Sequence, residues 1–198
     1  MSNWISIEGH LADGLPMRLY VAECPGKISA TCLHDDAHPR SSDEFEWQCR
    51  TAESAAEWPS SNRSSEVLRA AEQQVLEYFA GNRLQFDLPL RWQGTEFQIR
   101  VWQELTRVPF GQTPNYGTIA ERIGVPNASR AVGTANGRNR LPLFVPCHRI
   151  VAAGGKTGGF TGGLSLKKRL LAHEAAVLGI GTGIAGNLFG PEMPRSHA

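Results

Sequence analysis

The chain has 198 residues, enough for one large domain or two small ones, and its composition is ordinary for a globular protein. No apolar run approaches the roughly 20 residues of a membrane span, and the N-terminal segment does not resemble a secretory signal. We therefore expect a cytoplasmic protein without a membrane partner. The net charge is only +1, but residues 1–93 carry 8 Lys or Arg against 14 Asp or Glu, and residues 94–179 carry 11 against 4. The basic second half favours a polyanionic partner, unless the two halves neutralise each other.

The acidic half, residues 1–93, predicts a small α/β unit without obvious chemistry of its own. A Cys-Pro-Gly turn separates two short strands, and a polar stretch follows them. Apolar side chains then recur at helical spacing after an N-cap at Ser64 or Ser65. The expected elements are a hairpin (18–23 and 27–34), a loop (35–64), a helix (64–81) and an extended linker (82–94).

The basic half, residues 94–179, is predicted to be mainly helical. The expected helices are 95–108, 116–124, a segment that Pro126 opens and Ala128 to Ala135 continue, and 164–179. Two short helices around a glycine-containing turn form the helix-turn-helix pattern. The tail, residues 180–198, is rich in Gly and Pro, and we expect it to be disordered.

The second helix of this pair has an unusual composition. Its residues are nearly all small or β-branched, and Arg130 is its one long side chain. A helix that reads the major groove of DNA normally carries several long polar side chains. A surface of small side chains suits close approach, either to a minor groove or to a neighbouring helix.

The segment Pro-Cys-His-Arg-Ile, residues 146–150, carries the most chemistry. Adjacent residues on an extended segment point to opposite sides, so Cys147 and His148 need a turn or a bridging water to act together. The pair alone does not distinguish a nucleophile from a metal ligand or a small buried side chain.

Three features of the second half favour a nucleophile. Residues 130–149 contain Arg130, Arg138, Arg140, His148 and Arg149 and no acid, which favours a thiolate. Glu174 lies on the last predicted helix and could orient a base histidine. The glycine-rich segment 158–163 could close over a flat ligand.

A loose cluster of cysteine and histidine in the first half raises the alternative of a metal site. The spacing of Cys24, Cys32, His34, His38 and Cys49 matches no compact zinc pattern, so we expect no metal there. In a reducing compartment the four cysteines of the chain are expected to be free thiols.

Four segments of the second half together resemble a known family. RAVGTANGRN, VPCHRIVAAGG, TGGFTGGL and KKRLLAHE closely resemble the O6-alkylguanine-DNA alkyltransferases, also called methylated-DNA–protein-cysteine methyltransferases, over about residues 94–178. The resemblance implies a ribonuclease-H-like α/β N-terminal domain, residues 1–93. It also implies a mainly α, winged helix-turn-helix domain, residues 94–179, for DNA binding and alkyl transfer.

The resemblance implies a DNA repair protein that acts by direct reversal. Its partner would be double-stranded DNA that contains O6-alkylguanine, and it would also accept O4-alkylthymine. The damaged base must be flipped out, because it is inaccessible inside the duplex. The cysteine would take the alkyl group once and keep it, in a monomer that needs neither a metal nor an organic cofactor.

The resemblance also implies roles for individual residues. Cys147 would accept the alkyl group, and His148 would activate it through a water. Glu174 would orient the histidine, and Asn139 would brace the site. The residues implied in DNA binding are Arg130, which would replace the flipped base in the stack, with Tyr116, Ala131 and Gly133. The residues implied in the base pocket are Pro142, Val145, Ile150, Phe160 and Thr161.

The chain departs from the family pattern in the stretch after Asn139, which reads RLPLFV, and at three single positions. Phe160 stands where a tyrosine is usual, Thr161 where a serine or alanine is usual, and Arg169 where many members carry a tryptophan. Two other functions are open: a non-catalytic protein that binds alkylated DNA or regulates transcription, and a cysteine hydrolase. Relatives that only bind lesions lack the cysteine, which argues against the first. A hydrolase would need an oxyanion hole and repeated turnover.

Overall fold

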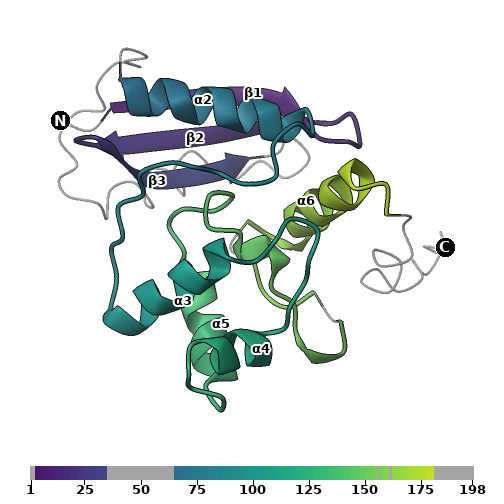
Figure 1. The fold of residues 1–198 in the computed structure, drawn as a ribbon. Coiled ribbons are helices and arrows are strands. Elements are labelled where there is room, and N and C mark those ends of the chain that lie inside the picture. Colours follow the sequence, from purple (N-terminus) through teal and green to yellow (C-terminus); the bar gives the residue numbers. More distant parts are fainter. Residues whose placement is uncertain (1–2, 35–64, 156, 161, 181–198) are drawn as a thin grey trace, which may run out of the picture.

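The computed structural model describes residues 3–34, 65–155, 157–160 and 162–180, and Figure 1 shows their arrangement. The predicted loop over residues 35–64, the tail beyond residue 180 and the expected pocket residue Thr161 lie outside the described residues. A sheet with one helix, here called the sheet layer, lies beside the other helices and their loops, here called the helical part (Figure 1).

The sheet is antiparallel with the strand order β1-β2-β3. Its strands are β1 (Asn3–His10), β2 (Pro16–Cys24) and β3 (Lys27–His34). The predicted hairpin is confirmed as β2–β3, and Gly26 in its turn has φ +71°, which glycine adopts without steric cost. The sequence prediction missed β1, although the alternation of buried Ile5 and Ile7 is typical of a half-buried strand.

Helix α2 (Glu66–Phe79) covers one face of the sheet and completes the sheet layer (Figure 1). Ser65 is its N-cap, and the Ser65 hydroxyl accepts a hydrogen bond from the Leu68 backbone N–H, as expected. Leu68 and the residues that follow it at helical spacing are fully buried, so α2 and the strands share one hydrophobic core.

The helical part contains the four predicted helices and two 3-10 turns. They are α3 (Glu96–Thr106), α4 (Tyr116–Arg122), α5 (Ser129–Gly137), η1 (Cys147–Arg149), η2 (Ala153–Gly155) and α6 (Leu164–Val177). The prediction that Pro126 opens α5 is wrong. The Ala128 N–H donates to the Val125 carbonyl over 2.9 Å, which closes a separate turn around Pro126, and the helix begins only at Ser129. No helix in the described part of the chain has both the length and the apolar character that a membrane crossing requires.

Strand β3 joins the sheet layer to the helical part. Its outer edge is covered by the linker, through a parallel bridge between Ile28 and Leu90. Further along the same edge, the Thr31 N–H donates to the Arg140 carbonyl over 2.9 Å, and the Thr31 hydroxyl donates to the Pro142 carbonyl over 2.8 Å. These bonds attach the loop between α5 and η1 to the sheet, and this loop leads directly into Cys147.

Candidate active site

Cys147 begins the 3-10 turn η1. The Cys147 N–H donates to the Val145 carbonyl over 2.7 Å, and the Arg149 N–H donates to the Pro146 carbonyl over 3.0 Å. Because the chain turns here, Cys147 and His148 are not forced to opposite sides as they would be in an extended segment. The turn that the sequence required for cooperation between the two side chains is present.

The side-chain amide of Asn139 binds the sulfur of Cys147. Asn139 Nδ2 donates to Sγ over 3.0 Å and to the Val145 carbonyl over 2.9 Å, while its Oδ1 accepts from the Leu141 N–H. Cys147 is only 2% exposed. Burial raises the pKa of the Cys147 thiol to about 11, although the Asn139 amide and the Lys167 ammonium favour the thiolate. The sulfur is therefore a neutral thiol at pH 7, and it needs a base to react as a thiolate.

His148 and Glu174 form a fully buried hydrogen-bonded pair, with 2.9 Å between Nε2 and Oε1. Arg149 Nε donates to both carboxylate oxygens over 3.0 and 3.1 Å, and the Gly111 N–H donates to Oε2 over 2.8 Å. The Tyr78 hydroxyl donates to Oε1 over 3.1 Å. Burial alone would raise the pKa of Glu174, but His148 and Arg149 outweigh it and lower the pKa to about 2. Glu174 is therefore a carboxylate at neutral pH.

His148 is arranged as a base. Burial lowers its pKa, although the neighbouring Glu174 carboxylate opposes that effect, so the imidazole is neutral at pH 7. Since Glu174 accepts at Nε2, that nitrogen carries the proton and Nδ1 carries the lone pair. Within the described part of the chain, Nδ1 has no hydrogen-bond partner. His148 can accept a proton at Nδ1 while Glu174 stabilises the resulting imidazolium.

Two residues of this cluster were missed from the sequence, Lys167 and Tyr78. Lys167 is fully buried, and its Nζ donates to the Ile150 carbonyl. The basic residues counted around Cys147 did not include it, although Lys167, Leu170 and Glu174 occupy one face of α6 at helical spacing. Tyr78 follows Val75 by three residues on the buried face of α2, so its inward direction could also have been predicted.

Four of the five residues expected to form a base pocket belong to the described part of the chain. Val145 and Ile150 are fully buried in the hydrophobic core, and they contact Asn139 and Lys167 through their backbone carbonyls. Pro142 is half-buried at the loop that binds β3. The ring of Phe160 lies edge-on to the ring of His148, with 6.5 Å between the centroids. Phe160 therefore lies beside the turn η1.

Tyr116, at the start of α4, lies between α5 and the glycine-rich segment. Its ring approaches Gly133, where an added Cβ would lie 3.9 Å from it. At Gly158 an added Cβ would lie 2.9 Å from the Tyr116 hydroxyl, and Gly158 has φ +63°, so only glycine fits there. Burial and the nearby Cys147 both raise the pKa of the Tyr116 phenol. Tyr116 thus lies against the glycine-rich segment, and its expected role in DNA binding stays a prediction.

Arg130 and Ala131 are not part of the buried cluster. Both are exposed on α5, together with Thr134, while Val132 and Ala135 bury the opposite face of the helix. The small side chains of α5 thus serve two purposes, because one face packs against α3 and α4 and the other faces solvent. Both interpretations of this helix, close packing and an exposed narrow surface, are compatible with this arrangement.

The described residues contain no group of three or more His, Cys, Asp or Glu side chains placed to hold a metal ion. Cys24 instead lies 2.7 Å from a guanidinium nitrogen of Arg91. His38 and Cys49, which belong to the loose cluster noted in the sequence, lie outside the described residues. The expectation of no metal site stays a prediction.

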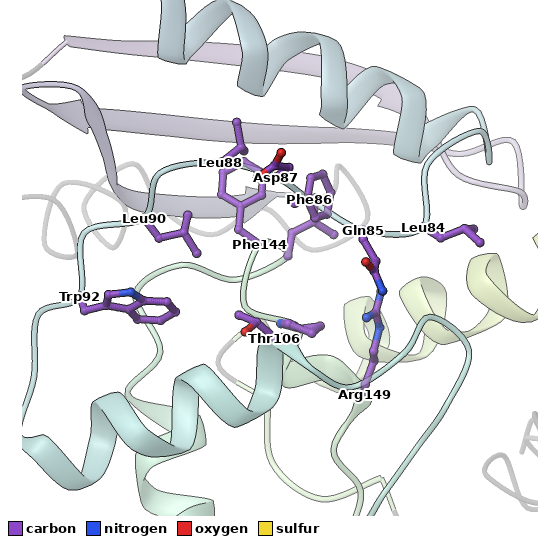
Figure 2. A pocket seen from close by; sticks show the side chains of 12 residues that line it. Leu84, Gln85, Phe86, Asp87, Leu88, Leu90, Trp92, Thr106, Phe144 and Arg149 are labelled. Atoms are coloured by element: carbon purple, nitrogen blue, oxygen red, sulfur yellow. The ribbon is translucent and has the colours of Figure 1, made fainter.

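A cavity of about 260 Å³ lies between the linker, residues 84–92, and the loop that carries the catalytic turn. Figure 2 shows the linker side chains around it, with the ring of Phe144 among them and Arg149 below them. Phe86 and Phe144 meet edge to face, with their ring centroids 4.9 Å apart. Arg149 lines this cavity and Cys147 does not. The cavity therefore lies on the far side of η1 from the sulfur, and it differs from the expected base pocket.

The chain is similar to known proteins both in sequence and in fold. The family model described as the DNA-binding domain of 6-O-methylguanine DNA methyltransferase matches residues 96–176. A protein of Mycolicibacterium paratuberculosis named methylated-DNA–protein-cysteine methyltransferase is 52% identical over 104 residues, which cover 52% of this chain and 63% of the relative. A protein of the same name from Methanosarcina acetivorans is 48% identical over 113 residues, 57% of this chain and 72% of the relative.

A solved structure extends the similarity to both layers. The structure of Mycobacterium tuberculosis OGT in complex with DNA is 33% identical, with a TM-score of 0.67, and the match covers 87% of this chain and 93% of that chain. The helical part contains a buried cysteine in the same turn as the histidine of a buried histidine–carboxylate pair. The chain belongs to the methylated-DNA–protein-cysteine methyltransferase family. The match spans slightly less than two thirds of the M. paratuberculosis relative, at 63% of its length.

Proposed function

We propose that this protein repairs O6-alkylguanine, and also O4-alkylthymine, in duplex DNA by moving the alkyl group once onto Cys147. The observation that carries the proposal is the buried sulfur of Cys147, which accepts a hydrogen bond from Asn139 in the same turn as the His148–Glu174 pair. The names of the relatives support this activity, since two of them are called methylated-DNA–protein-cysteine methyltransferase.

The chemistry is a single displacement. The thiol proton leaves Cys147 for Nδ1 of His148, through a water, and the thiolate attacks the alkyl carbon. A C–S bond forms, the bond between that carbon and guanine O6 breaks, and its electron pair returns to the purine. The purine then gains a proton, which His148 can return. The thioether product does not regenerate the thiol, so each molecule reacts once and no cofactor takes part.

The site residues have distinct roles in this proposal. Asn139 fixes the sulfur and favours the thiolate, and Glu174 stabilises the protonated His148. The proposed base pocket is formed by Pro142, Val145, Ile150, Phe160 and Thr161. Phe160 supports it by its position beside the His148 ring, where it can stack on a flipped base.

The exposed face of α5 is the proposed DNA interface. We assign α4 and α5 to a winged helix-turn-helix that enters the minor groove, within a domain of residues 94–179 that follows a ribonuclease-H-like domain of residues 1–93. Small exposed residues such as Ala131 allow close approach, and Gly133 leaves room for Tyr116. Arg130 is the one long exposed side chain at the start of α5 and would fill the space that the flipped base leaves. We also propose that the protein acts as a monomer and that it is located in the cytoplasm.

The decisive experiment is intact-mass and peptide mass spectrometry after incubation with a duplex that contains O6-methylguanine. We expect one added methyl group per molecule, on the peptide that contains Cys147. Cys147→Ser should gain none, and Cys24→Ser, at a cysteine outside the site, should behave like the wild type. Continued release of repaired DNA beyond one equivalent, or methyl transfer in Cys147→Ser, would contradict the proposal.

A further inference from the structure

Tyr78 connects the sheet layer to the catalytic carboxylate. It lies on α2, 96 residues before Glu174 in the chain, yet its hydroxyl donates to Glu174 Oε1 over 3.1 Å. The Tyr78 side chain is fully buried. Its ring packs edge-on against Phe110 and lies beside Phe86 and His173, at centroid distances between 5.2 and 5.8 Å. The hydroxyl is thus held at the carboxylate by rigid packing on several sides.

Helix α6, which carries Glu174, is bound to the sheet layer at further points. His173 Nδ1 accepts from the Ala12 N–H over 3.0 Å, and its Nε2 donates to the Tyr78 carbonyl over 2.9 Å, so the ring joins α6 to the sheet layer. One turn earlier, Arg169 binds both carboxylate oxygens of Asp13. These contacts fix the rotation and the position of α6 relative to α2, and therefore the distance between Tyr78 and Glu174.

The oxygens of the Glu174 carboxylate differ in their partners. Oε2 accepts from the Gly111 N–H and from Arg149, whereas Oε1 accepts from Arg149, His148 and Tyr78. Arg149 reaches both oxygens, so it does not select between them. Tyr78 is a neutral donor that reaches only Oε1, the oxygen that also holds His148, and it therefore restricts the carboxylate to the orientation that His148 needs.

We infer that Tyr78 is a positioning residue for the transfer reaction: its hydroxyl fixes Glu174 Oε1 against His148, so that the sheet layer takes part in activating Cys147. The expected effect of Tyr78 on the rate of alkyl transfer rests on the proposed function. The packing role of the ring is separable from this positioning, because phenylalanine retains the ring.

The test compares Tyr78→Phe with Tyr20→Phe, which removes a phenol hydroxyl from strand β2 of the same layer. Single-turnover transfer should be about tenfold slower in Tyr78→Phe, the size expected when one hydrogen bond to a buried charged group is lost. Methylated duplex and free O6-benzylguanine should be slowed equally, and DNA affinity should not change. Tyr20→Phe should match the wild type.

Two further measurements separate positioning from packing. In a Glu174→Gln background the added Tyr78→Phe change should have a much smaller effect, because the partner charge is gone. Imidazole 15N NMR should show that the pKa of His148 falls in Tyr78→Phe, because the carboxylate that favours the protonated ring is no longer held against Nε2. This readout needs no DNA, so it tests Tyr78 even if the proposed repair activity is absent. An unchanged His148 titration, a wild-type transfer rate, or equal slowing in both backgrounds would each overturn the inference.

Discussion

The ammonium of Lys167 donates a hydrogen bond to the carbonyl of Ile150, three residues after Cys147, and both residues are fully buried. Burial lowers the pKa of Lys167 to about 8, while the nearby Cys147 opposes that effect. Lys167 is also the cation that favours the thiolate of Cys147. A buried positive charge beside a thiol that must ionise has a direct use in the proposed reaction, because it stabilises the attacking thiolate.

We expect Lys167→Met to slow single-turnover transfer about tenfold, which corresponds to about one pKa unit in the thiol. Methionine retains the volume and removes the charge, so the thiolate loses a cation that favours it. Since Lys167 itself loses its proton near pH 8, the advantage of the wild type over the variant should be largest below that pH and should shrink above it. Transfer rates measured on either side of pH 8 test this expectation.

Lys168→Met is the matched control, because Lys168 is the exposed neighbour on the same helix. It should keep the wild-type rate with free O6-benzylguanine. If the ratio of the Lys167→Met rate to the wild-type rate does not depend on pH, the ammonium does not act on the thiol.

Asn139→Ala and Asn139→Asp should separate structural support from electrostatic support of Cys147. Alanine removes the bonds to the sulfur, the Val145 carbonyl and the Leu141 N–H, and we expect it to lower the free energy of unfolding by about 3 kcal/mol. Aspartate can still accept from Leu141, but it places a negative charge beside the sulfur and raises the pKa of the thiol. The transfer rate of Asn139→Asp should be at least about tenfold below that of Asn139→Ala. Urea unfolding measures the stability change, and single-turnover kinetics measures the transfer rates. A faster Asn139→Asp would rule out the electrostatic role.

The sequence predicted those parts of the fold whose signals are local. The N-cap at Ser65, the hairpin turn and the four helices of the second half all depend on residues within a few positions of one another. The start of α5 was misplaced, because proline is compatible with both a turn and a first helical residue. The family resemblance named Cys147 and Asn139, and the structure brings these two side chains into contact.

The long-range contacts could not be predicted in this way. Arg169 had no visible purpose in the sequence, and its partner Asp13 is 156 residues away. Tyr78 and Glu174 are 96 residues apart, and no local pattern relates them. Periodicity places each of these side chains on a face of its helix, but only the packing of the two layers decides which residue it meets.

Glu174→Gln should change how stability depends on pH. Because the pKa of Glu174 is lowered from 4.5 to about 2 in the folded protein, its contribution to stability is complete above pH 4.5 and is lost as the pH falls towards 2. The shift corresponds to about 3 kcal/mol. His148, whose pKa burial lowers, acts in a different window, since the unfolded state gains its proton below pH 6.5 and stability then falls.

Urea unfolding of wild type and Glu174→Gln across this range tests the assignment. The wild type should lose stability more steeply than the variant between pH 4.5 and 2. Between pH 6.5 and 4.5 the variant should lose at least as much stability as the wild type, because the pKa of His148 falls further without the Glu174 carboxylate. A variant that loses stability as steeply as the wild type below pH 4.5 would show that the Glu174 carboxylate is not the group that titrates.

Arg130→Ala should discriminate between substrates. Arg130 is exposed at the start of α5 and lies outside the buried cluster, so its loss should leave the chemistry at Cys147 intact. We expect transfer from methylated duplex to slow by about 100-fold, because unstacking a base costs a few kcal/mol and the side chain no longer fills its place. Reaction with free O6-benzylguanine should stay within about twofold of the wild type, since no base is flipped.

The control is Arg138→Ala, because Arg138 is another exposed arginine at the end of α5. This variant should weaken duplex binding through the loss of phosphate contacts alone, and its binding should depend less on salt. Equal losses on duplex and free base in Arg130→Ala would exclude a role in base flipping.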